Sequence, residues 1–130
     1  MSTFNLPIVG SHFRPPAKAI IQSLGMDFPL LLRREPENPH DPNAIAVLIY
    51  SRNLPPSSDA DLDLYAGGFG YDAASIRAER EWHLGYIPRT EALHIAPRLD
   101  AMGTTELDAR LSFDIKGAPT AKFAIGDIAP

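Results

Sequence analysis

The sequence contains no cysteine, so none of its 130 residues can form a disulfide or act as a thiolate metal ligand. It also lacks a basic N-terminal segment followed by a long apolar run, and neither a signal peptide nor a membrane span is predicted. We therefore expect a cytoplasmic protein without a membrane partner. Basic residues are few, with 12 lysines and arginines against 16 aspartates and glutamates, which excludes a strongly basic surface of the kind that coats duplex DNA.

Apolar periodicity and turn residues predict six strands and two short helices. One helix is expected at residues 16–24, because a proline stands at its first position and Gly25 follows its end. The other is expected to begin with Thr90 as its N-cap, to bury Leu93 and to be interrupted at Pro97. The strands are expected at residues 4–13, 28–34, 43–50, 82–88, 106–115 and 120–126.

The negative charge is concentrated in one segment. Residues 53–81 hold six of the 16 acidic residues and two of the 12 basic ones, net −4, which leaves ten of each in the rest of the chain. The stretch 52–81 is also rich in proline, glycine and serine, and it is typical of a long insertion between strands. We predict one mainly β domain over residues 1–130, a small six-stranded β-barrel with two short helices and this inter-strand insertion.

The most informative stretch is "REPENPHDPNAIAV", residues 34–47, which joins two apolar strands. Glu35, Asn38 and Asp41 each precede a proline, and such residues are pushed into extended conformations. The loop is therefore stiff. One interpretation is a stiffened loop whose asparagine and aspartate cap its own backbone. The other is a pre-organised site that holds Asn38, His40 and Asp41 ready to bind a ligand at little entropic cost.

This motif, with "PIVGSHF" at 7–13, "AKAIIQSLG" at 17–25 and "LGYIPRTE" at 84–91, resembles the HIRAN domain family. That family is a module found beside helicase and nuclease domains and also alone. The resemblance covers about residues 5–50 and 82–126. It implies an OB-like β-barrel that binds single-stranded DNA and captures its 3′ end, without a cofactor, in DNA repair or replication. A helicase, a nuclease or another DNA-processing protein is an implied partner.

The resemblance also implies roles for individual residues. Asp41 would accept a hydrogen bond from the terminal 3′-hydroxyl, and Asn38 would contact the terminal nucleotide. His40 would stack on a base, and Arg89 would meet a phosphate. The expected DNA-binding set is His12, Phe13, Arg14, Asn38, His40, Asp41, Tyr86 and Arg89.

His40 stands where the family often has tyrosine, and three further positions, His12, Glu37 and Tyr86, depart from the family pattern. A carboxylate at position 37 is unfavourable near phosphate, and the three departures weaken the expected DNA contacts. They favour a second hypothesis, in which the chain is a protein-binding adaptor. In that case the acidic segment 53–81 would dock on a basic surface of a DNA-processing enzyme.

Other chemistry finds little support in the sequence. His40 and Asp41 are adjacent, but no partnered nucleophile is evident, so we do not expect an enzyme. The four histidines show no ligand spacing, and no metal site is predicted. Trp82, the single tryptophan, is interpreted as a core residue rather than a stacking platform. Arg33 and Arg34 leave a strand side by side and are expected to point to opposite faces.

Overall fold

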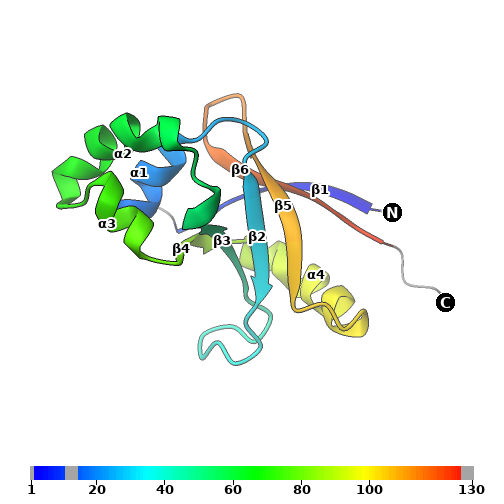
Figure 1. The fold of residues 1–130 in the computed structure, drawn as a ribbon. Coiled ribbons are helices and arrows are strands. Elements are labelled where there is room, and N and C mark those ends of the chain that lie inside the picture. The colour runs from blue at the N-terminus through cyan, green and yellow to red at the C-terminus, as the bar shows by residue number, and fades with distance from the viewer. Residues whose placement is uncertain (1, 11–14, 127–130) are drawn as a thin grey trace.

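The computed structural model describes residues 2–10 and 15–126, and it is mainly β (Figure 1). Six antiparallel strands form one open sheet in the order β1-β6-β5-β2-β3-β4. The six predicted strands are thus confirmed among the described residues. The strands are β1 (Ser2–Pro7), β2 (Pro29–Arg34), β3 (Ile45–Tyr50), β4 (Glu81–Tyr86), β5 (Glu106–Phe113) and β6 (Pro119–Ile125).

The helices lie in two places around the sheet. Helices α1, α2 and α3 gather at one end of the strands, and α4 lies behind β2 and β5 in the view of Figure 1. The helix predicted at 16–24 is confirmed as α1, one residue earlier at each end. The helices are α1 (Pro15–Ser23), α2 (Asp59–Ala66), α3 (Ala73–Ala78) and α4 (Arg89–Ala101).

Strand β3 forms the centre of the core. Its residues from Ile45 to Ile49 are all buried, without the alternation of a strand that has one wet face. Ile20 and Ile21 of α1 and Ile95 and Leu99 of α4 are buried in the same apolar cluster. Both faces of β3 are thus covered. The buried strand fixes the points at which the loop at 35–44 enters the sheet and the insertion leaves it.

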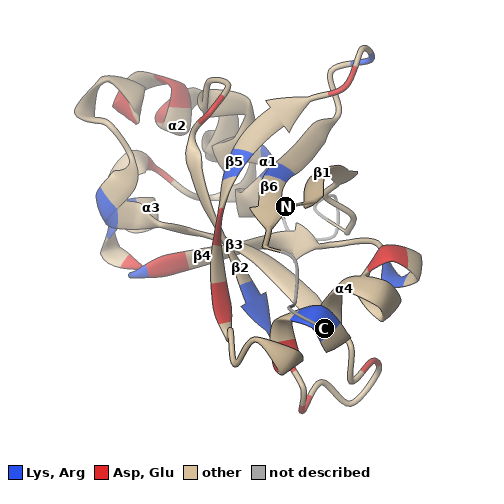
Figure 2. Cartoon of the chain, turned by 90° about the vertical axis from the view of Figure 1, so that its right-hand side faces the viewer, with Lys and Arg blue, Asp and Glu red and all other residues tan. Residues whose placement is uncertain are grey.

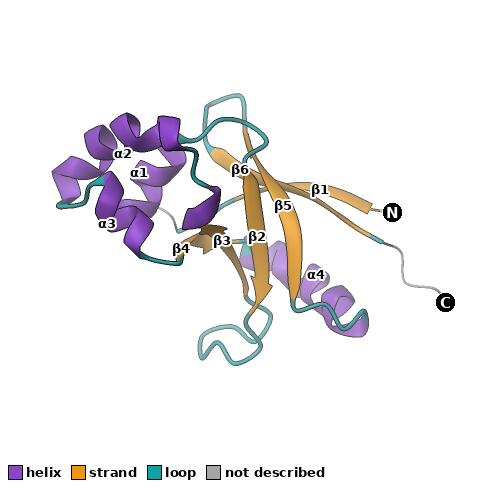
Figure 3. Cartoon of the chain, viewed as in Figure 1, coloured by secondary structure: helices purple, strands orange, loops and turns teal. Residues whose placement is uncertain are grey.

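The insertion is more ordered than its composition predicts. Two helices were expected in the whole chain, but residues 51–78 alone contain two α-helices and three 3-10 turns (Figure 3). Leu62 and Ala66, four residues apart on α2, are buried, and α2 packs against α1. A reciprocal pair of hydrogen bonds between Asp72 and Ser75 begins α3. The 3-10 turns are η2 (Ser51–Asn53), η3 (Pro56–Ser58) and η4 (Gly67–Phe69).

Helix α4 differs from its prediction in three respects. It begins at Arg89 after Pro88, so Thr90 is not its N-cap. It continues through Pro97 without interruption, and Leu93, expected in the core, is 55% exposed. Pro97 has no backbone N–H to donate, so the carbonyl of residue 93 lacks its usual hydrogen-bond partner within the helix. Both residues are exposed, so water can hydrate that carbonyl and the helix is kept.

One extra residue changes the direction of side chains along β4. The pairing of β3 with β4 shifts between Val47 and Leu48, and Leu84 has no partner in the register. Residues three apart in a regular strand face opposite sides. The bulge reverses that alternation, and the rings of His83 and Tyr86 meet edge to face at 4.6 Å.

The two ends of the sheet approach each other at one point. Val9, just beyond β1, exchanges two hydrogen bonds of 2.9 Å with Tyr86 of β4. The part of the predicted first strand at residues 11–13 lies outside the described residues. Gly85 allows this approach, because a Cβ at that position would lie 2.4 Å from the Val9 carbonyl oxygen.

We expect Gly85→Ala to lower the free energy of unfolding by about 1–3 kcal/mol, because backbone must move to admit the methyl group. Gly25→Ala is the matched control, since nothing lies within 4 Å of the added carbon. Urea unfolding of both variants measures the difference. Equal stability of the two would show that the Val9 approach does not constrain the sheet.

Candidate functional site

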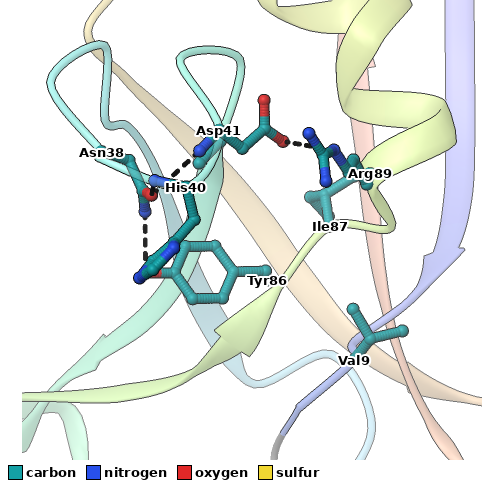
Figure 4. Close-up of a pocket in the computed structure, with 8 residues that line it drawn as sticks. Val9, Asn38, His40, Asp41, Tyr86, Ile87 and Arg89 are labelled. Atoms are coloured by element: carbon teal, nitrogen blue, oxygen red, sulfur yellow. Dashed lines mark hydrogen bonds and ion pairs between the residues drawn. The ribbon is translucent and has the colours of Figure 1, made fainter.

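Five of the eight expected site residues surround one pocket of about 370 Å³ (Figure 4). They come from the loop at 35–44 and from the junction between β4 and α4. The other three, His12, Phe13 and Arg14, lie outside the described residues. The pocket is lined by Val9, Asn38, His40, Asp41, Ala44, Tyr86, Ile87 and Arg89.

Asn38 organises the loop with both ends of its amide. Its Oδ1 accepts hydrogen bonds from the backbone N–H groups of His40 (2.9 Å) and Asp41 (3.2 Å). Its Nδ2 donates to Glu35 at 3.0 Å and to the Tyr86 hydroxyl at 3.4 Å. The side chain therefore holds the loop in shape, as the backbone-capping interpretation predicts.

Glu35 connects the loop to β4 and was not among the expected site residues. Its Oε1 accepts from the Tyr86 hydroxyl at 2.9 Å as well as from Asn38. The only signal in the sequence was its place before a proline in "REPENP". Nothing local indicates a partner 51 residues further along the chain.

Asp41 presents one carboxylate oxygen to the pocket. Its Oδ1 accepts from the backbone N–H of Asn43 at 2.9 Å, which fixes the carboxylate. Its Oδ2 lies 3.8 Å from the Nε of Arg89, too far for a hydrogen bond. The Asp41 side chain is 16% exposed and that of Arg89 78%. The arrangement thus combines a fixed acceptor with a cation that is largely in water.

Aromatic rings form one wall of the pocket. Tyr86 is half-buried, its hydroxyl is bound by Glu35, and its ring packs against His83. His40 is exposed at the tip of the loop and lines the same pocket (Figure 4). A flat apolar group in the pocket would therefore meet Tyr86, which is held in place, and His40, which is not packed into the core.

Buried Arg34 ties both ends of the loop to α4. Its Nη1 donates to the Ala44 carbonyl at 3.0 Å, and its Nε and Nη2 bind the two oxygens of Asp100 at 2.9 and 3.0 Å. The backbone N–H of Glu35 also donates to Ala44 at 3.0 Å. Arg33 points to the other face, as predicted, and binds Glu81 at 2.7 Å and Glu106 at 3.1 Å.

Two further findings bear on the chemistry of the described residues. Within residues 2–10 and 15–126, no group of three or more histidine, aspartate or glutamate side chains is placed to hold a metal ion. In the same part of the chain, every helix is too short or too polar to cross a membrane.

No family model matches the chain, and no curated protein or solved structure is significantly similar to it. The likeness to the HIRAN family therefore depends on the sequence motifs quoted above.

The Arg34–Asp100 pair predicts a loss of stability in acid. Hydrogen bonding to Arg34 lowers the pKa of the Asp100 carboxyl below its ordinary value of 3.8. The stabilisation is therefore present above that value and is lost as the pH falls through the lower pKa of the folded protein. We expect Asp100→Asn to remove this part of the acid dependence, measured as unfolding midpoints at a series of pH values.

Asp108→Asn is the matched control, because Asp108 is exposed on β5 and no ion pair is found for it among the described residues. The same acid dependence in wild type and in Asp100→Asn would contradict a stabilising role for the pair.

Proposed function

We propose that this chain is a non-catalytic module that binds single-stranded DNA and holds the nucleotide at its 3′ end in the pocket beside Asp41. The observation that carries the proposal is the fixed Oδ2 of Asp41, with Arg89 at 3.8 Å on one side. Tyr86 and His40 line the same pocket. An acceptor, a cation and aromatic rings are the three groups needed for a terminal hydroxyl, a phosphate and a base.

The carboxylate would select the kind of strand end. A free 3′-hydroxyl can donate a hydrogen bond to Oδ2, and hydrogen bonds to charged groups contribute about 1.5–3 kcal/mol. A 3′-phosphate has no hydroxyl to donate and carries negative charge, so it would be repelled by Asp41. Arg89 would meet the phosphate on the 5′ side of the terminal nucleotide, because its guanidinium extends into water.

Asn38 has a different part in this proposal from the one that the resemblance implies. Its amide already binds two backbone N–H groups and two side chains. It would therefore position His40 and Asp41 rather than contact the nucleotide. Glu35 would act in the same way on Tyr86.

The affinity for DNA should be modest. Arg89 is the one cation among the described residues that line this pocket, and each phosphate contact contributes a counterion-release term. A shallow dependence on salt follows. The OB-like barrel implied by the HIRAN resemblance belongs to the same proposal, and the Val9–Tyr86 bridge between the ends of the sheet supports it.

Asp41→Asn tests the selection of the end. The amide oxygen can still accept from Asn43, so the loop is kept, but Oδ2 becomes an uncharged donor. We expect wild type to bind a labelled strand with a free 3′-hydroxyl about tenfold or more tightly than the same strand with a 3′-phosphate. The variant should lose this preference, measured by fluorescence anisotropy at low salt.

Asp108→Asn serves as the control for the loss of one negative charge elsewhere on the chain. Equal binding of the two strands by wild type would reduce the chain to a general single-strand binder. Failure to bind either strand would reject the DNA proposal.

A second candidate function is favoured by the surface of the insertion. Leu64, Tyr65 and Phe69 are 70%, 39% and 50% exposed, on α2 and the turn that follows it. Residues 54–78 around them hold four aspartates and one arginine, net −3, and Figure 2 shows acidic residues on α2. An apolar patch in an acidic surface suits a partner that is both apolar and basic.

Deleting the insertion would also remove Leu62 and Ile76 from the core. Point variants on its surface therefore separate this adaptor role from DNA binding. We expect a synthetic amphipathic peptide, with leucine on one face and lysine on the other, to bind wild type. Leu64→Ser with Phe69→Ser should weaken that binding about tenfold or more and leave DNA binding unchanged.

The matched control is Met26→Ser with Ile115→Ser, two exposed apolar residues outside the insertion. Equal binding of the peptide to the patch variant and to this control would exclude the patch as a docking surface. Titration calorimetry measures all three proteins.

A further inference from the structure

A second pocket with aromatic walls lies between α1, the segment before α3, and β4. Its volume is about 320 Å³, and it is lined by Pro16, Ala17, Tyr71, Trp82 and His83. The Trp82 indole is fixed by a hydrogen bond of 2.8 Å from its Nε1 to the Ile76 carbonyl. The Tyr71 ring meets the Trp82 ring edge to face at 5.8 Å. Both rings are half-buried, so each still presents surface to a ligand.

The two pockets adjoin through one pair of rings. His83 lines the second pocket, Tyr86 lines the first, and their ring centres are 4.6 Å apart. The bulge at Leu84 makes this contact possible, because it places the two side chains on one face of β4. Trp82, next to His83 on β4, lines the second pocket with it.

We propose that this second pocket binds an unpaired base of the same DNA strand, on the 5′ side of the terminal nucleotide. The inference rests on the proposed function, in which the first pocket holds the nucleotide at the 3′ end of the strand. The second pocket adjoins the first along β4, so the nucleotides on the 5′ side of the strand end would reach it. Its aromatic walls suit a base, because every base has a face that can stack.

The lining favours a base over a phosphate. Among the described residues that line the second pocket there is no lysine or arginine. The nearest carboxylate along β4, Glu81, is bound at both oxygens by Arg33 (2.7 and 3.0 Å), which offsets its repulsion of the strand. A base bound here should therefore add affinity without making the dependence on salt steeper.

The single tryptophan makes the proposal directly measurable. All tryptophan emission comes from Trp82, so a base that stacks beside it should change that emission. The probes are thymidine 5′-monophosphate, whose single base cannot fill both pockets at once, and the tetranucleotide and hexanucleotide of deoxythymidine with free 3′-hydroxyls. We expect the mononucleotide to bind without a change in emission. The longer strands should quench the emission and bind about fivefold or more tightly.

Tyr71→Ala tests the pocket while leaving the Trp82 hydrogen bond in place. It should abolish the gain in affinity with length and spare binding of the mononucleotide, whereas Tyr71→Phe, which keeps the ring, should retain the gain. Tyr65→Ala is the control for loss of a tyrosine elsewhere in the insertion, and circular dichroism verifies that each variant is folded.

Three outcomes would overturn the inference. Equal affinity for all three probes with unchanged emission would leave the first pocket as the whole site, and the proposed function would stand. Quenching by a proline-rich peptide but not by the oligonucleotides would assign the second pocket to a protein segment. Binding of none of the nucleotides would reject the proposed function and the inference together.

Discussion

The site depends first on one buried cation. Arg34 is 8% exposed, and its guanidinium binds the Ala44 carbonyl and both oxygens of Asp100. A buried guanidinium is costly unless its donors are satisfied, so the surrounding groups are held where they satisfy it. These groups belong to the far end of the loop and to α4. The same contact thus sets the width of the loop and its position relative to the helix that begins with Arg89.

Within that frame, polar side chains of the loop bind one another and β4 before any ligand arrives. Glu35, Asn38 and Tyr86 form a closed set of hydrogen bonds, and prolines restrict the backbone between them. Asp41 keeps one oxygen outside this set. The backbone of the loop and the side chains of Asn38 and Tyr86 therefore have little freedom left to lose if a ligand binds.

The sequence predicted the sheet better than it predicted the insertion. Alternating apolar residues located β4 and the hairpin of β5 and β6, and continuous apolar runs located β2 and β3. Proline, glycine and aspartate in 52–81 concealed α2, whose burial depends on contact with α1 and not on local propensity. The loop motif identified Asp41 and His40 as site residues. The role of Glu35 depends on its hydrogen bond from Tyr86, 51 residues further along the chain, and could not be predicted from the motif.

The helical insertion also has a consequence for the solubility of the sheet. Strand β4 is at an edge of the sheet, and a bare edge can pair with another copy of the chain and start aggregation. Here the backbone N–H and C=O of Tyr86 are hydrogen-bonded to Val9. Helix α1, which packs against α2, also contacts β4. Local opening of these helices would uncover this edge while the sheet remained folded. Aggregation that follows such an opening should therefore begin at β4.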